Sequence, residues 1–255
     1  MAHTFTSMTL NLWGDWDFAR RRDSLARMMS LREPDLLGVQ ELCPQSAEVI
    51  DAALPHHERV HSDGGWLEEG NLWWNTDLFE AIEHGFVDIG HQERYRGLFW
   101  VKLKHRHHAT LAPLVLATAH LTFPGNPDEL RTERSPRTDQ ARAAATALQE
   151  IASDGTAILC LDANDYARPL WAMYDAGFRD PFGTLGRTCP FTFPVTPRFD
   201  RPMRWEGVHV VEKVLDWHLF IGELRPRCAE VVDFFLDNVA PSDHKPVVTT
   251  FTQHS

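Results

Sequence analysis

The sequence has little positive charge for its length of 255 residues. Lys and Arg number 25 against 36 Asp and Glu, which gives a formal net charge of −11. A protein that binds nucleic acid mainly through the backbone phosphates is expected to be basic, at least on one face. The charge therefore disfavours nucleic acid as the main partner, although a local basic cleft is compatible with it.

Cysteines are few and lie far apart. The chain has four of them and no Cys-x-x-Cys pair, so a zinc cluster is not expected, and a reducing compartment fits this usage best. The N-terminus has no basic flank followed by an apolar run, and the longest strongly apolar stretch, around Leu114–Ala119, is too short to cross a bilayer. We therefore expect a cytoplasmic protein without a signal peptide or a transmembrane segment.

No internal repeat, low-complexity tract or clear linker divides the chain, so we predict one domain over residues 1–255. Apolar runs alternate with segments of helical periodicity, which predicts an α/β fold. The expected strands are Phe5–Leu12, Leu36–Val39, two or three within Trp66–Ile89, Gly97–Lys104, Leu114–Thr122, Ala157–Asp162, Val208–Ile221, Cys228–Phe235 and Pro246–Phe251. The expected helices are one capped by Asp17, Ser46–Leu54, Thr138–Ile151 and Arg168–Ala176, with a polar loop at Asn126–Arg137 and a solvated hairpin at Lys104–His108.

The stretch Ala157–Asp165 is the most informative part of the sequence. Five apolar residues form a run that is typical of a strand buried on both faces, and the run leads directly into Asp162 and Asn164. Side chains alternate along a strand, so these two polar side chains are aimed the same way. A turn or a helix cap explains the pair equally well when it is considered alone.

The same pattern recurs along the chain. Apolar strands also lead into Asn11, Glu41 and His120, and Asp243-His244 lies directly before the last strand. Asp216 lies inside a strand, where a carboxylate is costly unless it has a partner; a salt bridge with a nearby basic residue is the alternative explanation. Together these positions predict strand ends that converge on one site of carboxylate, amide and imidazole groups.

Such a set of side chains suits a hard divalent cation and a phosphate. Mg²⁺ prefers oxygen ligands, usually one or two carboxylates completed by water and phosphate. Imidazole and amide donors bind phosphate oxygens as negative charge develops, and a remaining carboxylate or His–Asp pair can deprotonate a water molecule. The predicted chemistry is therefore metal-dependent hydrolysis of a phosphoester.

At this point the sequence resembles a known family, the endonuclease/exonuclease/phosphatase superfamily, which includes DNase I-like nucleases. The resemblance rests on ordered motifs that span almost the whole chain: Asn11, Gln40-Glu41, His120-Leu121, Asp162-x-Asn164, Asp216 and Ser242-Asp243-His244. It implies a two-sheet, four-layer α/β sandwich with mixed, mostly antiparallel sheets and the site at one end. The chain departs from the family pattern at Leu161, where relatives usually have Gly, and at Lys213–Trp217.

The resemblance also implies roles for these residues. Glu41 is the main ligand of Mg²⁺, for which Mn²⁺ can substitute, with Asn11 beside it and Asp243 contributing directly or through water. Asp162 orients and deprotonates the attacking water, and Asn164 and His120 bind the phosphate. His244, held by Asp216, either stabilises the phosphoryl oxygens or serves as the base.

The substrate is less well defined by the sequence. We favour a phosphodiesterase that acts on a small-molecule, nucleotide or lipid-headgroup diester, with a DNase I-like or apurinic-type nuclease as the alternative. An inactive binding module of the same fold is a second alternative. The candidate substrate-binding residues are Trp13, Arg131, Arg198 and Trp205, for which core packing or solvated loop charges are the simpler interpretations.

Overall fold

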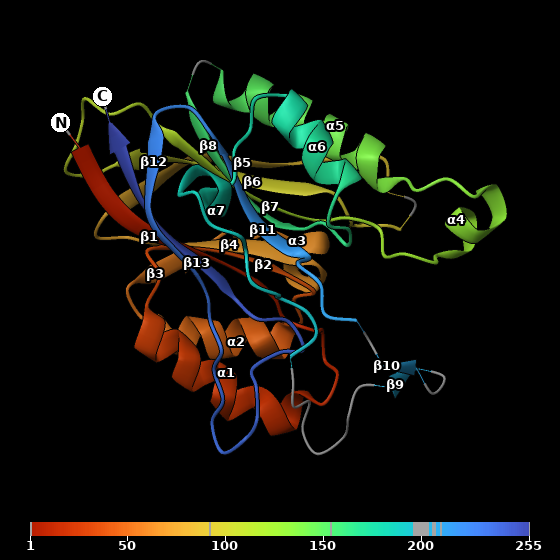
Figure 1. Cartoon of the computed structure of the whole chain (residues 1–255). Coiled ribbons are helices and arrows are strands. Elements are labelled where there is room, and N and C mark those ends of the chain that lie inside the picture. Colours follow the sequence, from red (N-terminus) through yellow and green to blue (C-terminus); the bar gives the residue numbers. More distant parts are fainter. Residues whose placement is uncertain are drawn as a thin grey trace.

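The computed structural model describes residues 2–91, 93–153, 155–195, 204–205, 208–209 and 211–254. Two large β-sheets face each other, and helices cover both outer faces (Figure 1). Each sheet contains one parallel strand pair, and its other pairings are antiparallel. The prediction of a four-layer α/β sandwich with mixed, mostly antiparallel sheets is therefore confirmed.

The first sheet has the strand order β12 (Leu224–Val231), β13 (Val247–His254), β1 (Ala2–Asn11), β2 (Leu36–Gln40), β4 (Gly70–Asn75) and β3 (His57–Arg59). The second sheet has the order β11 (Asp216–Ile221), β8 (Thr156–Asp162), β7 (Leu114–His120), β6 (Leu98–His105) and β5 (Phe79–Val87). A separate short pair consists of β9 (Arg204–Trp205) and β10 (Val208–His209).

Helices α1 (Phe18–Arg32) and α2 (Pro44–Ala53) pack on the outer face of the first sheet, and α5 (Arg137–Ala152) and α6 (Arg168–Asp175) pack on that of the second. The short helices are α3 (Gly65–Glu68), α4 (Pro127–Thr132) and α7 (Pro181–Thr184). Across the described residues, no helix combines the length and the apolar character that a membrane span requires.

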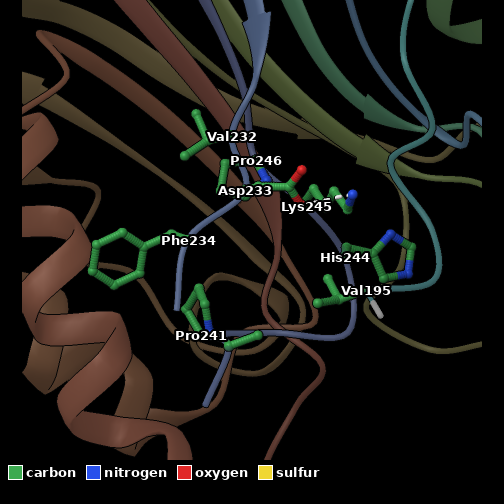
Figure 2. Close-up of a pocket in the computed structure, with 9 residues that line it drawn as sticks. Val195, Val232, Asp233, Phe234, Pro241, His244, Lys245 and Pro246 are labelled. Atoms are coloured by element: carbon green, nitrogen blue, oxygen red, sulfur yellow. Dashed lines mark ion pairs between the residues drawn. The ribbon is translucent and has the colours of Figure 1, made fainter. Parts of the chain in front are cut away.

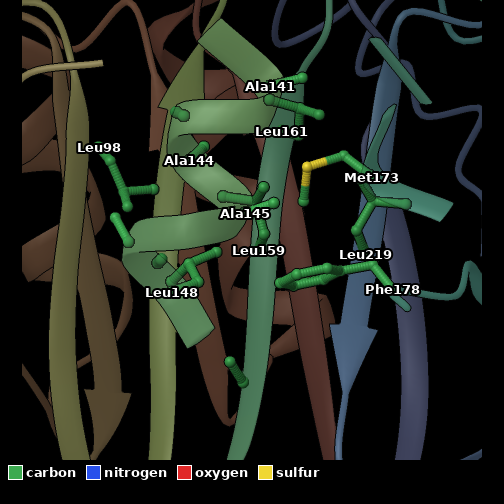
Figure 3. Packing of buried hydrophobic residues seen from close by; sticks show 14 of the residues in the cluster. Leu98, Ala141, Ala144, Ala145, Leu148, Leu159, Leu161, Met173, Phe178 and Leu219 are labelled. Carbon is green, nitrogen blue, oxygen red and sulfur yellow. The ribbon is translucent and has the colours of Figure 1, made fainter. Parts of the chain in front are cut away.

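The alternation of side chains along β1 builds the layers. Met8 and Leu10 point outward and pack with α1 and α2, whereas Phe5 points inward and packs between the sheets. On the opposite side of the sandwich, α5 presents its small side chains Ala141 and Ala145 to the second sheet, which lets the helix lie close to the apolar strand β8 (Figure 3).

The two sheets approach closely where the site residues emerge. Gly38 lies in β2 opposite Cys160 of β8, and a Cβ atom at position 38 would lie 2.6 Å from the Cβ of Cys160. Contacts between real Cβ atoms essentially never reach that distance, so a larger residue at position 38 would force the sheets apart. The close approach makes hydrogen bonds between side chains of opposite sheets possible.

A row of buried polar side chains uses this approach. His218 of β11 contacts Ser7 Oγ through Nε2 at 3.1 Å and Thr249 Oγ1 through Nδ1 at 3.0 Å. Nearer the site, the Gln40 amide donates to Thr118 Oγ1 across the sheets at 2.8 Å. Buried polar groups need such partners, and these hydrogen bonds fix how the two sheets align.

Several local predictions differ from the structure. Trp66 lies in α3 rather than in a strand, because the strand begins only after this single helical turn, at Gly70. The predicted polar loop at residues 126–137 contains α4, whose first turn is capped by the Asn126 side chain. The strand expected from Val208 is interrupted, and β11 begins at Asp216. The predicted strand Cys228–Phe235 is shifted, because β12 ends at Val231 and the following residues form a loop.

Two further predictions are wrong at single side chains. Asp17 precedes α1, but it has a φ of +50° and its side chain makes no capping hydrogen bond. His105 is not part of a solvated hairpin: it is 5% exposed at the end of β6, where its Nδ1 lies 2.7 Å from His3 Nδ1. An interpretation of the His-rich run alone could not include this partner, which lies 102 residues away near the N-terminus.

The buried His218 predicts acid sensitivity. Burial lowers its pKa to about 3, whereas the unfolded chain has the ordinary histidine value of 6.5. The unfolded state therefore binds the proton more tightly, and stability falls as the pH drops from about 6.5 towards 3. Between pH 7 and pH 5, His218 should cost the wild-type protein about 2 kcal/mol of unfolding free energy, and we expect His218→Gln not to lose this amount.

Urea unfolding at the two pH values measures this difference. The matched control is His61→Gln, at an exposed histidine, which should retain the wild-type pH dependence. An equal loss of unfolding free energy in wild type and His218→Gln would contradict the assignment.

Candidate functional site

The predicted site residues gather at one end of the sandwich because of strand register. In the second sheet, Asp162 lies opposite His120 of the parallel neighbour β7 and opposite Asp216 of the antiparallel neighbour β11. In the first sheet, Asn11 lies opposite Gln40, so Glu41 follows directly at the same edge. Residues from distant parts of the sequence are therefore brought together by backbone pairing.

Asn11 connects the two sheets at this edge. Its Nδ2 donates to Glu41 Oε1 and to Asp162 Oδ2, both at 2.9 Å, and its Oδ1 accepts the backbone N–H of Trp13 at 2.9 Å. In this orientation the Asn11 amide holds two carboxylates close together from opposite sheets. Asp162 is 1% exposed, whereas the Glu41 side chain is 30% exposed and faces the opening of the site.

Three non-glycine residues beside the strand ends have left-handed backbone conformations. Trp13 has a φ of +60°, Glu41 of +50° and Asn164 of +46°. Asn tolerates this region, but Trp and Glu adopt it at a cost, and such strain concentrates at functional sites. Because of this turn, the Asn164 side chain points back to the end of β7, where its Nδ2 donates to Leu121 O at 2.9 Å.

His120 lies in a chain of hydrogen bonds. Its Nδ1 donates to Glu69 Oε1 at 3.0 Å, and Glu69 also accepts from Arg96 Nε at 3.0 Å. Its Nε2 faces the Asn164 amide at 2.9 Å and Asp162 Oδ2 at 3.6 Å. Burial alone would lower the pKa of His120, but Asp162 and Glu69 outweigh it and raise that pKa above the ordinary value.

Glu69 and Arg96 were not among the residues predicted from the sequence. Glu69 immediately follows the short helix α3, and neither a motif nor the end of an apolar strand marks it. Burial alone would raise its pKa, but the hydrogen bonds and charges of His120 and Arg96 hold the pKa below its ordinary value. The Glu69 carboxylate thus fixes the orientation of the His120 ring.

Asp216 and His244 form the buried pair that was predicted. His244 Nδ1 lies 2.8 Å from Asp216 Oδ2, and His244 Nε2 lies 4.0 Å from Asp162 Oδ2. Burial raises the pKa of Asp216. Burial would lower the pKa of His244, but Asp216 and the other nearby carboxylates raise it well above its ordinary value. The electrostatic environment therefore favours an imidazolium at His244.

The loop between β12 and β13 presents His244 (Figure 2). Ser242 Oγ donates to Asn11 O at 2.6 Å and accepts the N–H of His244 at 3.2 Å, which ties the loop to the end of β1. Lys245 pairs with Asp233 at 2.7 Å within the same loop. The small hollow beside His244 in this view has no room for a water molecule, so it is packing rather than a substrate pocket.

Arg21 is a third residue that the sequence analysis did not assign to the site. It is 0% exposed, and its guanidinium donates to the carbonyls of Leu12, Trp13, Gly14, Trp16 and Pro241 at 2.7–3.0 Å. These carbonyls belong to the loop after Asn11 and to the loop before Asp243. A signal was present, because Arg21 falls at helical spacing among the buried apolar residues of α1.

The candidate substrate-binding residues are scattered. Trp13 is half-buried with its ring 5.2 Å from the Arg21 guanidinium, and the exposed Arg131 pairs with Asp128 at 2.9 Å. Asp243, which was predicted as a metal ligand and not as a substrate-binding residue, is 8% exposed and lies between Ser242 and His244 in the sequence. Arg198 lies outside the described residues, and so does the side chain of Trp205, of which the structure describes the backbone in β9.

The donor atoms at this end of the sandwich fit a divalent metal. Ligand atoms of Asp162, Asp216 and His244 lie within 4.8 Å of one another, and all three residues are buried. Asp216 Oδ1 is buried without a hydrogen-bond partner among the described residues. Glu41 adds a further carboxylate, because its Oε1 accepts from the same Asn11 amide as Asp162 Oδ2. Carboxylate oxygens are the donor type of a hard cation such as Mg²⁺.

The model of the Endonuclease/Exonuclease/phosphatase family matches residues 8–244, and the chain belongs to this family. The resemblance noted in the sequence is thus confirmed. Members of the family are phosphoester hydrolases, so the chain is an enzyme of this class, and they typically use a divalent metal. No curated protein sequence matches the chain.

Solved structures show the same fold. TDP2 from D. rerio, complexed with a single strand DNA product, superposes with a TM-score of 0.78 at 17% identity and covers 97% of this chain and 98% of that chain. An endonuclease/exonuclease/phosphatase from Bacteroides vulgatus gives a TM-score of 0.76 at 17% identity, and the match covers 99% of this chain and 100% of that chain. The mannosyl-6-phosphatase Bt3783 from Bacteroides thetaiotaomicron VPI-5482 gives a TM-score of 0.73 at 16% identity, and the match covers 97% of this chain and 99% of that chain.

Replacing Arg21 should destabilise the loops that carry the site. Arg21→Met removes five hydrogen bonds and leaves buried carbonyls without donors, so we expect a loss of about 3 kcal/mol or more in the free energy of unfolding. The matched control Arg22→Met changes an exposed arginine on the same helix and should stay within about 0.5 kcal/mol of wild type. Urea unfolding measures both variants, and equal midpoints for Arg21→Met and wild type would refute this role.

Proposed function

We propose that the protein is a Mg²⁺-dependent phosphodiesterase that hydrolyses a small-molecule, nucleotide or lipid-headgroup diester. The observation that carries the proposal is the position of Asp162: its carboxylate accepts from Asn11 at 2.9 Å and lies 3.6 Å from His120 Nε2 and 4.0 Å from His244 Nε2. One carboxylate is thus surrounded by groups that can hold a phosphate and a metal. Residues 1–255 act as one domain in this proposal, since site residues come from both sheets.

The metal site in this proposal consists of Glu41, with Asp243 contributing directly or through water and Asn11 orienting the carboxylates. Glu41 is suited to the role because it is the carboxylate of the set that faces the opening. When bound, Mg²⁺ or Mn²⁺ would neutralise the negative charge that develops on the phosphoryl oxygens. Asn11 keeps Glu41 and Asp162 from separating under their mutual repulsion.

The protein groups then divide the remaining work. Asp162 orients and deprotonates the attacking water, and the amide of Asn164 and the ring of His120 bind the phosphoryl oxygens. Asp216 and Asp162 raise the pKa of His244 and so favour a positively charged ring, which suits a donor to those oxygens better than a base. Asp162 is therefore our choice for the base.

Two considerations support a small substrate over a nucleic acid. The net charge of −11 opposes a polyanion, and the candidate cation Arg131 is paired with a carboxylate of its own helix, α4. The likeness to TDP2 with its single strand DNA product keeps the nuclease alternative open to test. The cytoplasmic location expected from the sequence stays a prediction.

Hydrolysis of bis(p-nitrophenyl) phosphate tests the proposal directly. We expect turnover with Mg²⁺ or Mn²⁺ and none with EDTA. Glu41→Gln and Asp162→Asn should each lower kcat/KM by about a hundredfold or more, because they remove a metal ligand and the base while keeping side-chain shape.

The matched control is Glu48→Gln, the same chemical change at an exposed position on α2, which should retain wild-type turnover. Turnover that persists in EDTA would contradict a metal-dependent reaction. Wild-type protein that binds Mg²⁺ but hydrolyses neither this diester nor p-nitrophenyl phosphate would contradict the expected turnover of a small model ester.

Salt dependence separates the small-diester reaction from the nuclease alternative. Nucleic-acid binding releases counterions and weakens steeply as salt rises, whereas a small diester makes too few phosphate contacts for such an effect. We expect kcat/KM for bis(p-nitrophenyl) phosphate to change less than about twofold between roughly 50 and 200 mM NaCl. An oligonucleotide cleaved faster than this diester, with a steep fall over the same range, would favour the nuclease.

A further inference from the structure

A cavity of about 460 Å³ lies next to the site, between the connection from β7 to α5 and the turn after β5. We name it the α4 cavity, after the helix that forms its outer wall; its wall includes Gly90, Thr122, Asn126, Thr132, Arg134 and Gln140. Its volume is in the range of pockets that hold small ligands or parts of them. The roles proposed above for the reacting groups leave this cavity unused.

The wall of the α4 cavity is tied to the reacting end of the sandwich. Thr122 lies two residues after His120; its N–H donates to Gln140 Oε1 at 3.1 Å and its carbonyl accepts from Arg137 at 3.0 Å. The carbonyl of Leu121, between His120 and Thr122, accepts from Asn164 Nδ2 at 2.9 Å. A group that occupies the cavity is therefore placed at a fixed position relative to His120 and Asn164.

The charged side chains around the cavity are mostly paired with partners of opposite charge. Four carboxylates and two guanidinium groups belong to the wall: Glu93, Asp128, Glu129, Asp139, Arg131 and Arg134. Arg131 is neutralised by Asp128 at 2.9 Å, and Glu129 is neutralised by the buried Arg137 at 2.6 Å. Asp139 pairs with Arg142 at 2.9 Å, and Glu93 lies 3.9 Å from Arg96. The wall therefore offers little net charge, which suits an uncharged polar group better than a second phosphate.

The wall has few apolar side chains. Its side chains are mostly carboxylates, guanidiniums, hydroxyls and amides, and Pro127 and Pro136 are its larger apolar members. Ser135 Oγ is buried at the wall without a hydrogen-bond partner among the described residues. Carboxylate acceptors beside guanidinium and hydroxyl donors are complementary to alcohol groups, which both donate and accept.

We propose that the α4 cavity binds an uncharged, hydroxyl-rich group of the substrate, a sugar or another polyol esterified to the phosphate that is cleaved. The inference rests on the proposed function and names the class of alcohol that the site selects. The enzyme would discriminate against a substrate that lacks this hydroxyl-rich group, because the polar side chains of the wall then lose hydrogen bonds to it. Thr132, exposed on α4, faces this space and has no part in the core.

Two diesters with the same leaving group test the proposal: methyl p-nitrophenyl phosphate and glucose 6-(p-nitrophenyl phosphate). We expect wild-type kcat/KM to be at least about tenfold higher for the glucose diester. Thr132→Trp, which fills the cavity, should abolish this preference and leave the methyl diester within about twofold of wild type. Thr146→Trp, the same substitution at an exposed position of α5 outside the cavity, should behave as wild type.

The outcomes separate this inference from the proposed function. Equal wild-type kcat/KM for the two diesters, or an equal loss for both in Thr132→Trp, would overturn the cavity assignment while leaving phosphodiester hydrolysis intact. If wild type hydrolyses neither diester, the proposed function fails, and calorimetric titration with methyl glucoside 6-phosphate then decides the cavity assignment. Binding to wild type that Thr132→Trp removes supports it, and no binding to wild type refutes it.

Discussion

Two parallel strand pairs, β1–β2 in one sheet and β7–β8 in the other, determine where the central proposed reacting groups lie. Parallel neighbours end at the same edge of a sheet, so Asn11 and Glu41 emerge together, as do His120 and Asp162. The antiparallel strand β11 then begins at Asp216, directly opposite Asp162. Because the sheets face each other, these edges coincide, and Asn11 donates across them to Asp162.

The arrangement is costly, and the fold accommodates it in a specific way. Carboxylates and imidazoles at a buried sheet edge lose hydration, which appears as the raised pKa of Asp216. The polar row between the sheets, with Ser7, His218 and Thr249 in its middle, extends this cost into the core. The His218 ring contacts both Ser7 and Thr249, so the row aligns the two sheets and thereby positions the site edge. Arg21 performs the same task for the loops.

The parts of the site that follow strands were predictable from the sequence, and the parts that follow tertiary contacts were not. Asp162 and Asn164 could be identified because an apolar run leads directly into them. The expected strand alternation does not reach Asn164, because β8 ends at Asp162 and a left-handed turn aims the Asn164 amide. Glu69 comes after one turn of helix and meets His120 only because α3 precedes β4 in the first sheet. Arg21 looked like one of several arginines on an amphipathic helix, although its spacing already placed it on the buried face. The error at His105 has the same origin, since its partner His3 lies 102 residues away.

The residues at the strand ends and the residues of the connecting segments have different parts in our proposal for how the substrate is recognised. The strand ends hold a compact set of oxygen and nitrogen donors around Asp162, and this chemistry suits the phosphate of many esters without recognising the alcohol. Recognition of the alcohol needs surface beyond the sheet edge, which the connections after β5 and β7 provide. Arg137 pairs with Glu129 and holds Thr122, so it couples α4 to the end of the strand that carries His120. A change in the α4 segment can therefore alter which alcohol is accepted while the reacting groups keep their register.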